Sequence, residues 1–234
     1  MNDISQAFGA ALQMILTADA SLRAIVALSI KVSFAAVAIA ALIGLPLGAL
    51  LGVTRFAGRQ TVIALLNALM GLPPVVVGLV IYLMLSRAGP LGEFGLLFTP
   101  AAMVIAQAVL ITPIIAALSR QVIEDAWREY EEQLRSLGAS TASAAQTLIW
   151  DTRFTLITVV LAGFGRAAAE VGAVMIVGGN IDGVTRVMTT AIALETSKGD
   201  LPLALGLGLV LVALVIGVNL IAHVIKLTAQ RHYG

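Results

Sequence analysis

An arginine and a glutamate lie inside one of the apolar stretches of the chain. Arg166 and Glu170 are four residues apart within the run Phe154–Ile181. A charge near the centre of a bilayer costs about 2.5–3.5 kcal/mol to insert, and residues at i and i+4 share one face of a helix. We therefore expect the two side chains to form an ion pair. The pair is either a structural tie at a helix or subunit interface, or a functional group within the membrane.

Other residues that carry chemistry are rare. The chain has no cysteine, which excludes thiolate metal sites and cysteine nucleophiles, and its two histidines, His223 and His232, are too few for a metal cluster. None of the lysines (Lys31, Lys198 and Lys226) is followed by Ser or Thr, so none completes a Walker-type phosphate loop. No HExxH or GxSxG motif is present. We expect no enzymatic activity, no metal and no cofactor in this chain.

Two adjacent prolines, Pro73 and Pro74, interrupt the apolar run Thr61–Ser86. Proline removes a helical hydrogen bond and clashes with the preceding turn. Carbonyl groups that are freed at membrane depth need protein or water around them. We therefore expect a kinked helix, which either lines a cavity or serves packing alone.

One long hydrophilic segment, Arg120–Arg153, separates the third and fourth apolar runs. It contains no proline and is typical of helices. Gly138 marks the end of one helix, and Ser140 is a suitable N-cap for the next. Ordered loops of this length are uncommon unless they have a role. The segment is either a solvated loop or a helix–glycine–helix element that docks into a groove on a partner.

These residues belong to a chain that is too apolar for a soluble domain. It is 59% hydrophobic and 12% charged, whereas soluble domains are about 45–50% apolar and about 25% charged. The formal net charge of +1 argues against binding to nucleic acid. A membrane-spanning helix needs about 20 apolar residues, and the candidate spans are Val32–Val53, Thr61–Ser86, Phe94–Ser119, Phe154–Ile181 and Leu201–Ala222. The sequence predicts an all-α, polytopic membrane protein with about five transmembrane helices.

The ends of the chain and the loop charges give a topology. Residues 1–20 carry apolar side chains at helical spacing and favour an interfacial helix, so that residues 21–234 form the transmembrane domain. Lys and Arg are enriched in cytoplasmic loops. One set of flanks holds eight such residues and the other holds four: Arg55, Arg59, Arg120, Arg128, Arg135, Arg153, Lys226 and Arg231 against Arg23, Arg87, Arg186 and Lys198. We expect the N-terminus outside and the C-terminus in the cytoplasm.

The hydrophilic segment resembles the coupling loop of ATP-binding-cassette (ABC) importer permeases. That loop has the pattern EAA, three residues, glycine, nine residues, isoleucine, one residue, and LP. Here Glu132 begins the stretch in place of EAA, Gly138 has the required offset, and Leu148 takes the isoleucine position. The alanines are absent, and Trp150 and Asp151 replace the Leu-Pro pair.

Three further stretches resemble the tungstate-type permeases, which are small relatives of the molybdate and sulfate permeases. These stretches are NALMGLPPVVVGL (67–79), AGFGRAAAEVGAVMIVGGNIDG (162–183) and TRVMTTAIALETSKGD (185–200). The likeness extends from about Val32 to the end of the chain. It implies a permease subunit in the cytoplasmic membrane of a bacterium or archaeon. The subunit would import an oxyanion, and tungstate is the first candidate.

The resemblance also implies partners and roles. The chain would pair with a second copy of itself among membrane lipids and would bind cytoplasmic subunits that hold ATP and Mg²⁺. An extracytoplasmic binding protein would dock on Asn180–Asp200, where we expect a surface or re-entrant helix. The coupling residues would be Glu132, Gly138, Ala139 and Leu148, and Glu132 would cap or pair across the bend. The residues of the pathway or its gate would be Pro73, Pro74, Arg166 and Glu170.

Two alternatives stay open. The first is a permease for molybdate or another tetrahedral oxyanion. Molybdate has the same charge as tungstate and nearly the same size, and selection between these two would fall to the binding protein. A stand-alone channel or secondary transporter would instead use Arg166 and Glu170 as its ion relay.

Overall fold

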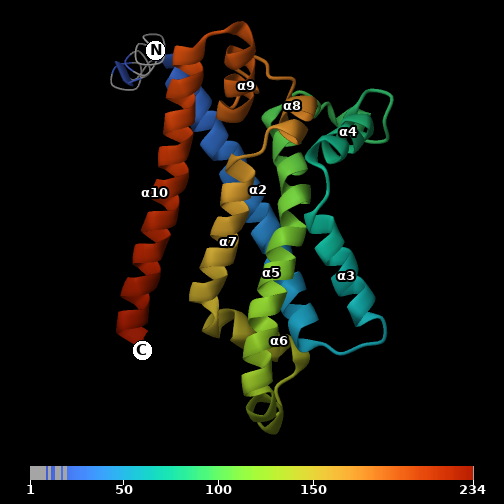
Figure 1. Ribbon diagram of the computed structural model, residues 1–234. Helices are drawn as coiled ribbons and strands as arrows, with labels where there is room; N and C mark the ends of the chain where they lie inside the picture. Colours follow the sequence, from blue (N-terminus) through green and yellow to red (C-terminus); the bar gives the residue numbers. More distant parts are fainter. Residues whose placement is uncertain (1–8, 10–11, 14–16, 18–19, 234) are drawn as a thin grey trace. The chain divides into compact units, whose positions relative to one another are not determined.

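The computed structural model describes residues 9, 12–13, 17 and 20–233, without the side chains of 222–223 and 225–233. The described residues form helices and no strand (Figure 1). These elements are α2 (Ala20–Val53), α3 (Arg59–Met70), α4 (Pro74–Leu85), the 3₁₀ helix η1 (Gly92–Phe94), α5 (Pro100–Ser136), α6 (Thr141–Asp151), α7 (Arg153–Ala168), α8 (Gly172–Gly178), α9 (Met188–Lys198) and α10 (Leu201–Tyr233). The interfacial helix expected over residues 1–20 lies almost wholly outside the described residues, as does the side chain of His223.

Within the described part of the chain, three helices are long and apolar enough to cross a membrane. They are α2, α5 and α10, and two bent pairs, α3 with α4 and α6 with α7, raise the number to as many as five. Three of the expected spans thus correspond to single helices with shifted ends. Helix α2 begins twelve residues earlier than expected, and α10 continues past Ala222. Helix α5 begins at Pro100 rather than at Phe94, because Gly95 and Phe98 have positive φ angles and interrupt the run.

The other two expected spans are not continuous helices. The run Thr61–Ser86 is divided between α3 and α4, whose axes differ by 95°, so the proline pair produces a full break instead of a kink. The run Phe154–Ile181 is divided between α7, which ends at Ala168, and the short α8, which begins at Gly172. Glu170 therefore lies beyond the end of α7. The prediction that Arg166 and Glu170 share one helical face is wrong.

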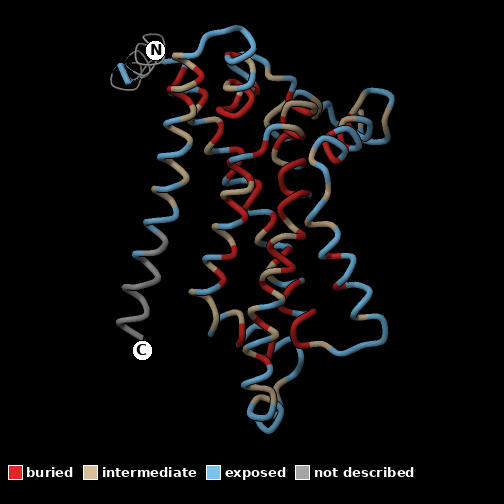
Figure 2. The backbone as a smooth tube through the Cα atoms, in the orientation of Figure 1, coloured by how far each residue is buried: buried red, intermediate tan, exposed pale blue. Residues whose placement is uncertain are grey.

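The chain forms two compact units, each built from three separate stretches of the sequence. The boundaries between these stretches do not coincide with the ends of the apolar runs. The first unit contains residues 1–35, 73–107 and 167–219, and the second contains residues 36–72, 108–166 and 220–234. Helix α5 contributes to both, and it is the most buried of the three long helices: 61% of its most apolar window is buried, against 17% for α10 (Figure 2). Buried side chains of α5 therefore lie in both units, among them Met103 in the first and Ile115 in the second.

In the second unit, glycines spaced four residues apart bring α2 against α5. A Cβ atom on Gly48 would overlap Ser119 Oγ and the Ala116 carbonyl, and one on Gly52 would lie 2.9 Å from Ile123. Small residues at this spacing allow two helix backbones to approach closely. Ser119 is fully buried there and donates a hydrogen bond to the carbonyl of Gly44 at 3.3 Å.

In the first unit, α4 packs closely on α8, and α9 packs on the first turns of α2. A Cβ atom on Gly78 would lie 2.7 Å from the backbone of Ala173, so only glycine permits the α4–α8 contact. Apolar side chains of α2, α9 and α10 form a buried cluster: Leu22, Ile25, Met188, Ala191 and Leu207. The buried hydroxyl of Ser29 caps the start of α9 by accepting a hydrogen bond from Met188 N at 2.8 Å.

Candidate coupling and pathway sites

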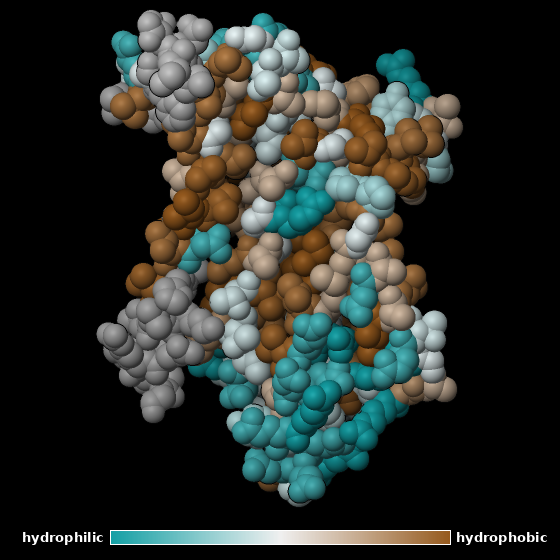
Figure 3. Space-filling view, in the orientation of Figure 1, coloured by the Kyte–Doolittle hydropathy of each residue, from teal (hydrophilic) through white to brown (hydrophobic). Residues whose placement is uncertain are grey.

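The hydrophilic segment forms the helix–glycine–helix element that the sequence predicts. Helix α5 has no charged residue from Pro100 to Ser119, which is enough to span the apolar core, and it then continues as a charged extension to Ser136. Gly138 adopts a left-handed conformation with φ of 71°. Ser140 then caps α6 by accepting a hydrogen bond from Ser143 N at 3.2 Å. Figure 3 shows hydrophilic side chains gathered at this end of α5 and over α6.

The four predicted coupling residues have different surroundings. Leu148 is 1% exposed and anchors α6, whereas Ala139 is half-buried and donates its backbone N–H to the carbonyl of Leu134 at 3.0 Å. A Cβ atom on Gly138 would meet nothing within 4 Å, so the requirement for glycine comes from its conformation rather than from space. Glu132 is exposed and makes no ion pair with any residue that the structure describes. The prediction that it pairs across the bend is wrong.

Two residues that the sequence analysis did not select are the most exposed apolar groups of this element. Leu137 is 81% exposed and Trp150 is 71% exposed. The guanidinium of Arg153 lies 4.7 Å from the centre of the Trp150 ring, which fixes the ring on the surface. An exposed leucine and an exposed tryptophan within a charged segment mark a surface for protein contact.

Two carboxylates tie the α2–α3 connection to the charged extension of α5. Glu124 pairs with Arg59 at 3.2 Å, with Arg128 at 3.3 Å and with Arg120. Glu131 pairs with Arg55 and with Arg135 at 3.1 and 2.8 Å. Burial alone would raise the pKa of Glu124, which lies beyond the apolar part of α5. The three neighbouring guanidinium groups outweigh this effect and hold the pKa of Glu124 below its ordinary value.

The prolines Pro73 and Pro74 form the start of α4. Pro73 is the N-cap and Pro74 is the first helical residue, where its missing N–H costs little. The Pro73 carbonyl accepts hydrogen bonds from Val76 and Val77 N at 3.0 and 3.2 Å, and Gly71 ends α3. The break is therefore satisfied by local backbone hydrogen bonds on both sides.

The break after α7 is satisfied by side chains from distant parts of the chain. Glu170 is 3% exposed, and its carboxylate accepts a hydrogen bond from Ala173 N at 3.1 Å, at the start of α8. Thr189 donates a hydrogen bond to the Glu170 carbonyl at 2.7 Å. Gln107 on α5 donates one to the Ala167 carbonyl at 3.1 Å, while its own Oε1 is buried and unpaired. Glu170 thus caps the start of α8 with its side chain. Gln107 and Thr189 satisfy the backbone carbonyls of Ala167 and Glu170 at the break.

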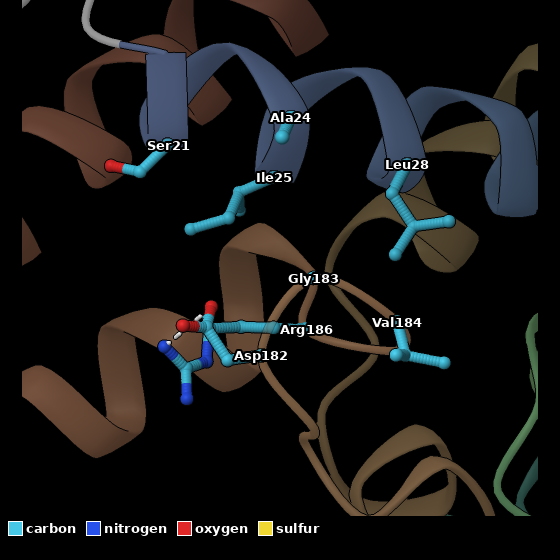
Figure 4. A pocket seen from close by; sticks show the side chains of 8 residues that line it. All are labelled: Ser21, Ala24, Ile25, Leu28, Asp182, Gly183, Val184 and Arg186. Atoms are coloured by element: carbon cyan, nitrogen blue, oxygen red, sulfur yellow. Dashed lines mark ion pairs between the residues drawn. The ribbon is translucent and has the colours of Figure 1, made fainter.

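The segment from α8 to α9 is a folded surface element. Its expected helix is α9, which is confirmed. Arg186 pairs with Asp182 at 3.0 Å beside a cavity of about 370 Å³, whose other wall is formed by Ser21, Ala24 and Leu28 of α2 (Figure 4). Lys198 pairs with Glu195 at 3.0 Å. These ion pairs restrict the positions of four charged side chains within the segment.

Comparison with known proteins places these elements among transport proteins. Residues 44–231 match the family described as "Binding-protein-dependent transport system inner membrane component". The chain is 41% identical to the tungstate uptake system permease protein TupB of Peptoclostridium acidaminophilum, over 95% of this chain and 98% of that protein. It is also 41% identical to a probable anion ABC transporter permease protein of Haloferax volcanii (85% and 88%) and to TupB of Campylobacter jejuni (74% and 73%).

Proposed function

The chain belongs to the family of inner membrane components of binding-protein-dependent transport systems, and from this premise we propose that it is the permease through which an ABC importer carries tungstate into the cytoplasm. Two relatives of 41% identity are named as tungstate uptake permeases, which supports tungstate as the substrate. Molybdate is the principal alternative, since the two dianions differ little in size.

One observation carries the coupling role: the helix–glycine–helix element at the end of α5. The charged extension of α5, the left-handed Gly138 and the capped α6 present Leu137 and Trp150 to a partner. The α2–α3 connection is tied to the same extension through Glu124 and Glu131. A displacement of the α5 extension is therefore transmitted through ion pairs to the start of α3.

The division of labour follows from the chain's own residues. No lysine completes a phosphate loop, so ATP and Mg²⁺ are bound by separate ATPase subunits, and this chain holds no cofactor and catalyses no covalent step. Two copies of residues 21–234 form the pathway, with residues 1–20 at the interface of the bilayer. The N-terminus lies outside, the C-terminus lies in the cytoplasm, and the α8–α9 segment docks the binding protein.

The pathway residues lie beside the two helix breaks. Pro73 and Pro74 set the direction of α4, and Glu170 caps α8. Arg166 lies in the last turn of α7. A guanidinium attracts an oxyanion, and a pathway site must be weak enough not to hold the anion permanently. The residues that we assign to the pathway or its gate are Pro73, Pro74, Arg166 and Glu170.

Uptake by the reconstituted complex tests this proposal. Proteoliposomes that contain the permease and its ATPase subunit are supplied with binding protein, ATP and tungstate, and internal tungsten is measured by mass spectrometry. We expect accumulation that requires ATP and the binding protein. Accumulation by the permease alone would identify a channel or secondary transporter instead. Uptake is also measured with excess molybdate. If molybdate abolishes tungstate uptake only with a binding protein that also binds molybdate, the selection between the two anions is made by the binding protein.

A further inference from the structure

A pocket of about 200 Å³ lies between the charged extension of α5 and α6. Its apolar lining includes Leu134 and the fully buried Leu148. Its polar lining includes Tyr130, Thr147 and Asp151. The volume is equivalent to about seven water molecules at about 30 Å³ each. It therefore accepts a long side chain rather than a single solvent molecule.

The electrostatic character of the pocket is negative. Asp151 is exposed and makes no ion pair with any residue among those described. The carboxylates of Glu129 and Asp151 raise the pKa of Tyr130, which reports the same negative field at the pocket wall. The arginines on this element are occupied elsewhere: Arg135 pairs with Glu131, and Arg153 stacks on Trp150.

Exposed apolar groups adjoin the pocket. Leu137 belongs to its lining, and Trp150 precedes Asp151 in the chain. Both are largely exposed in the single chain. Around a charged contact, such apolar groups exclude water once a partner is bound, and this strengthens the interaction.

We propose that this pocket receives a lysine or arginine side chain of the ATPase subunit, with the methylene stem against Leu134 and Leu148 and the cation at Asp151. Long basic side chains bury their stems in this way while the charged end reaches a polar group. The proposal rests on the coupling function of the element and adds the chemistry of the partner residue. It assigns recognition to the carboxylate of Asp151 rather than to that of Glu132.

Binding of the solubilised full-length permease to its ATPase subunit tests the proposal, measured as a dissociation constant at low and high salt. We expect Asp151→Asn to weaken binding about tenfold and to reduce the dependence on salt, because a buried charge pair is lost. Asp151→Glu should retain most of the affinity. Thr147→Phe, which fills the pocket without a change of charge, should weaken binding to a similar degree. Asp125→Asn is the matched control, since Asp125 is an exposed carboxylate of the same extension outside the pocket.

The outcomes separate this proposal from the coupling proposal. If the wild-type permease does not bind the ATPase subunit, the coupling function itself is wrong. If the wild type binds and Asp151→Asn binds with unchanged affinity and salt dependence, the pocket proposal alone is overturned. The same conclusion follows if Asp125→Asn weakens binding as much as Asp151→Asn, because the effect is then one of general charge. Circular dichroism confirms that each variant retains its helices.

Discussion

At the scale of single residues, Gly138 has the clearest relation between its backbone conformation and its proposed coupling function. Its φ of 71° belongs to the left-handed region, which costs roughly 1–2 kcal/mol for most other residues. This conformation turns the chain so that the carbonyls at the end of α5 are capped and α6 can begin at Thr141, after its N-cap Ser140. The direction of α6, and with it the position of Trp150, therefore depends on one backbone torsion.

We expect Gly138→Glu to abolish retention of the ATPase subunit and transport, while insertion into the membrane stays normal because no apolar helix is changed. Gly138→Asn is the control, since asparagine enters the left-handed region more readily than other residues. Pull-down of the ATPase subunit with detergent-solubilised permease measures the effect. If the Gly138→Glu protein keeps its partner and full uptake, segment 120–153 has no coupling function.

At the scale of elements, the ion pairs of Glu124 attach the start of α3 to α5. Glu124→Gln removes the charge that three arginines share, and we expect it to lower the free energy of unfolding by about 1–3 kcal/mol. Because the pKa of Glu124 is lowered in the folded protein, its stabilisation is complete above the ordinary pKa of the carboxyl group. It is lost as the pH falls through the lowered value.

Thermal unfolding in detergent between pH 3 and 7 measures this contribution. The wild type should lose stability in the acidic part of this range more steeply than Glu124→Gln. Asp125→Asn serves as the comparison, because Asp125 is 76% exposed and should contribute little. Identical acid profiles for the wild type and Glu124→Gln would show that the cluster does not stabilise the extension.

The sequence predicts the existence of these elements better than their breaks. Apolar runs indicate the long helices, and Gly138 with Ser140 indicates the turn between α5 and α6, because both signals are local. The end of α7 has no such signal. No proline follows Ala168, and the break is stabilised by Gln107 and Thr189, which lie 60 and 19 residues from the groups they bind. The spacing of Arg166 and Glu170 therefore predicts a shared helical face that the fold does not form, because α7 ends at Ala168.

The packing between helices is only partly predictable from the sequence. The glycines Gly44, Gly48 and Gly52 carry a four-residue spacing that is visible in the sequence, and the close approach of α2 to α5 follows from it. The spacing alone does not name the partner helix. Leu137 and Trp150 are also visible as apolar residues in a charged segment, but only the fold shows that Leu137 and Trp150 are exposed while Leu148 is buried.

At the scale of the whole molecule, the proposed orientation places the coupling element and the α8–α9 segment on opposite sides of the membrane. The wild-type chain contains no cysteine, so single cysteines can report the side directly. Ser136 at the end of α5 and Ser197 in α9 are both exposed, and neither substitution changes the buried core. Their hydroxyl groups bond only to carbonyls of their own helices.

We expect a membrane-impermeant maleimide to label Ser197→Cys from outside intact cells. Ser136→Cys should react only after the membrane is opened or in inverted vesicles. The physical reason is the excess of Lys and Arg in the flanks that include Arg120, Arg128 and Arg135, which favours the cytoplasm for that end of α5. A cysteine at Ser86, after α4, gives a third point on the side of Ser197. The proposed topology has one membrane crossing between Ser136 and Ser197. Labelling of Ser136→Cys and Ser197→Cys from the same side would require an even number of crossings between them, and the proposed topology would be wrong.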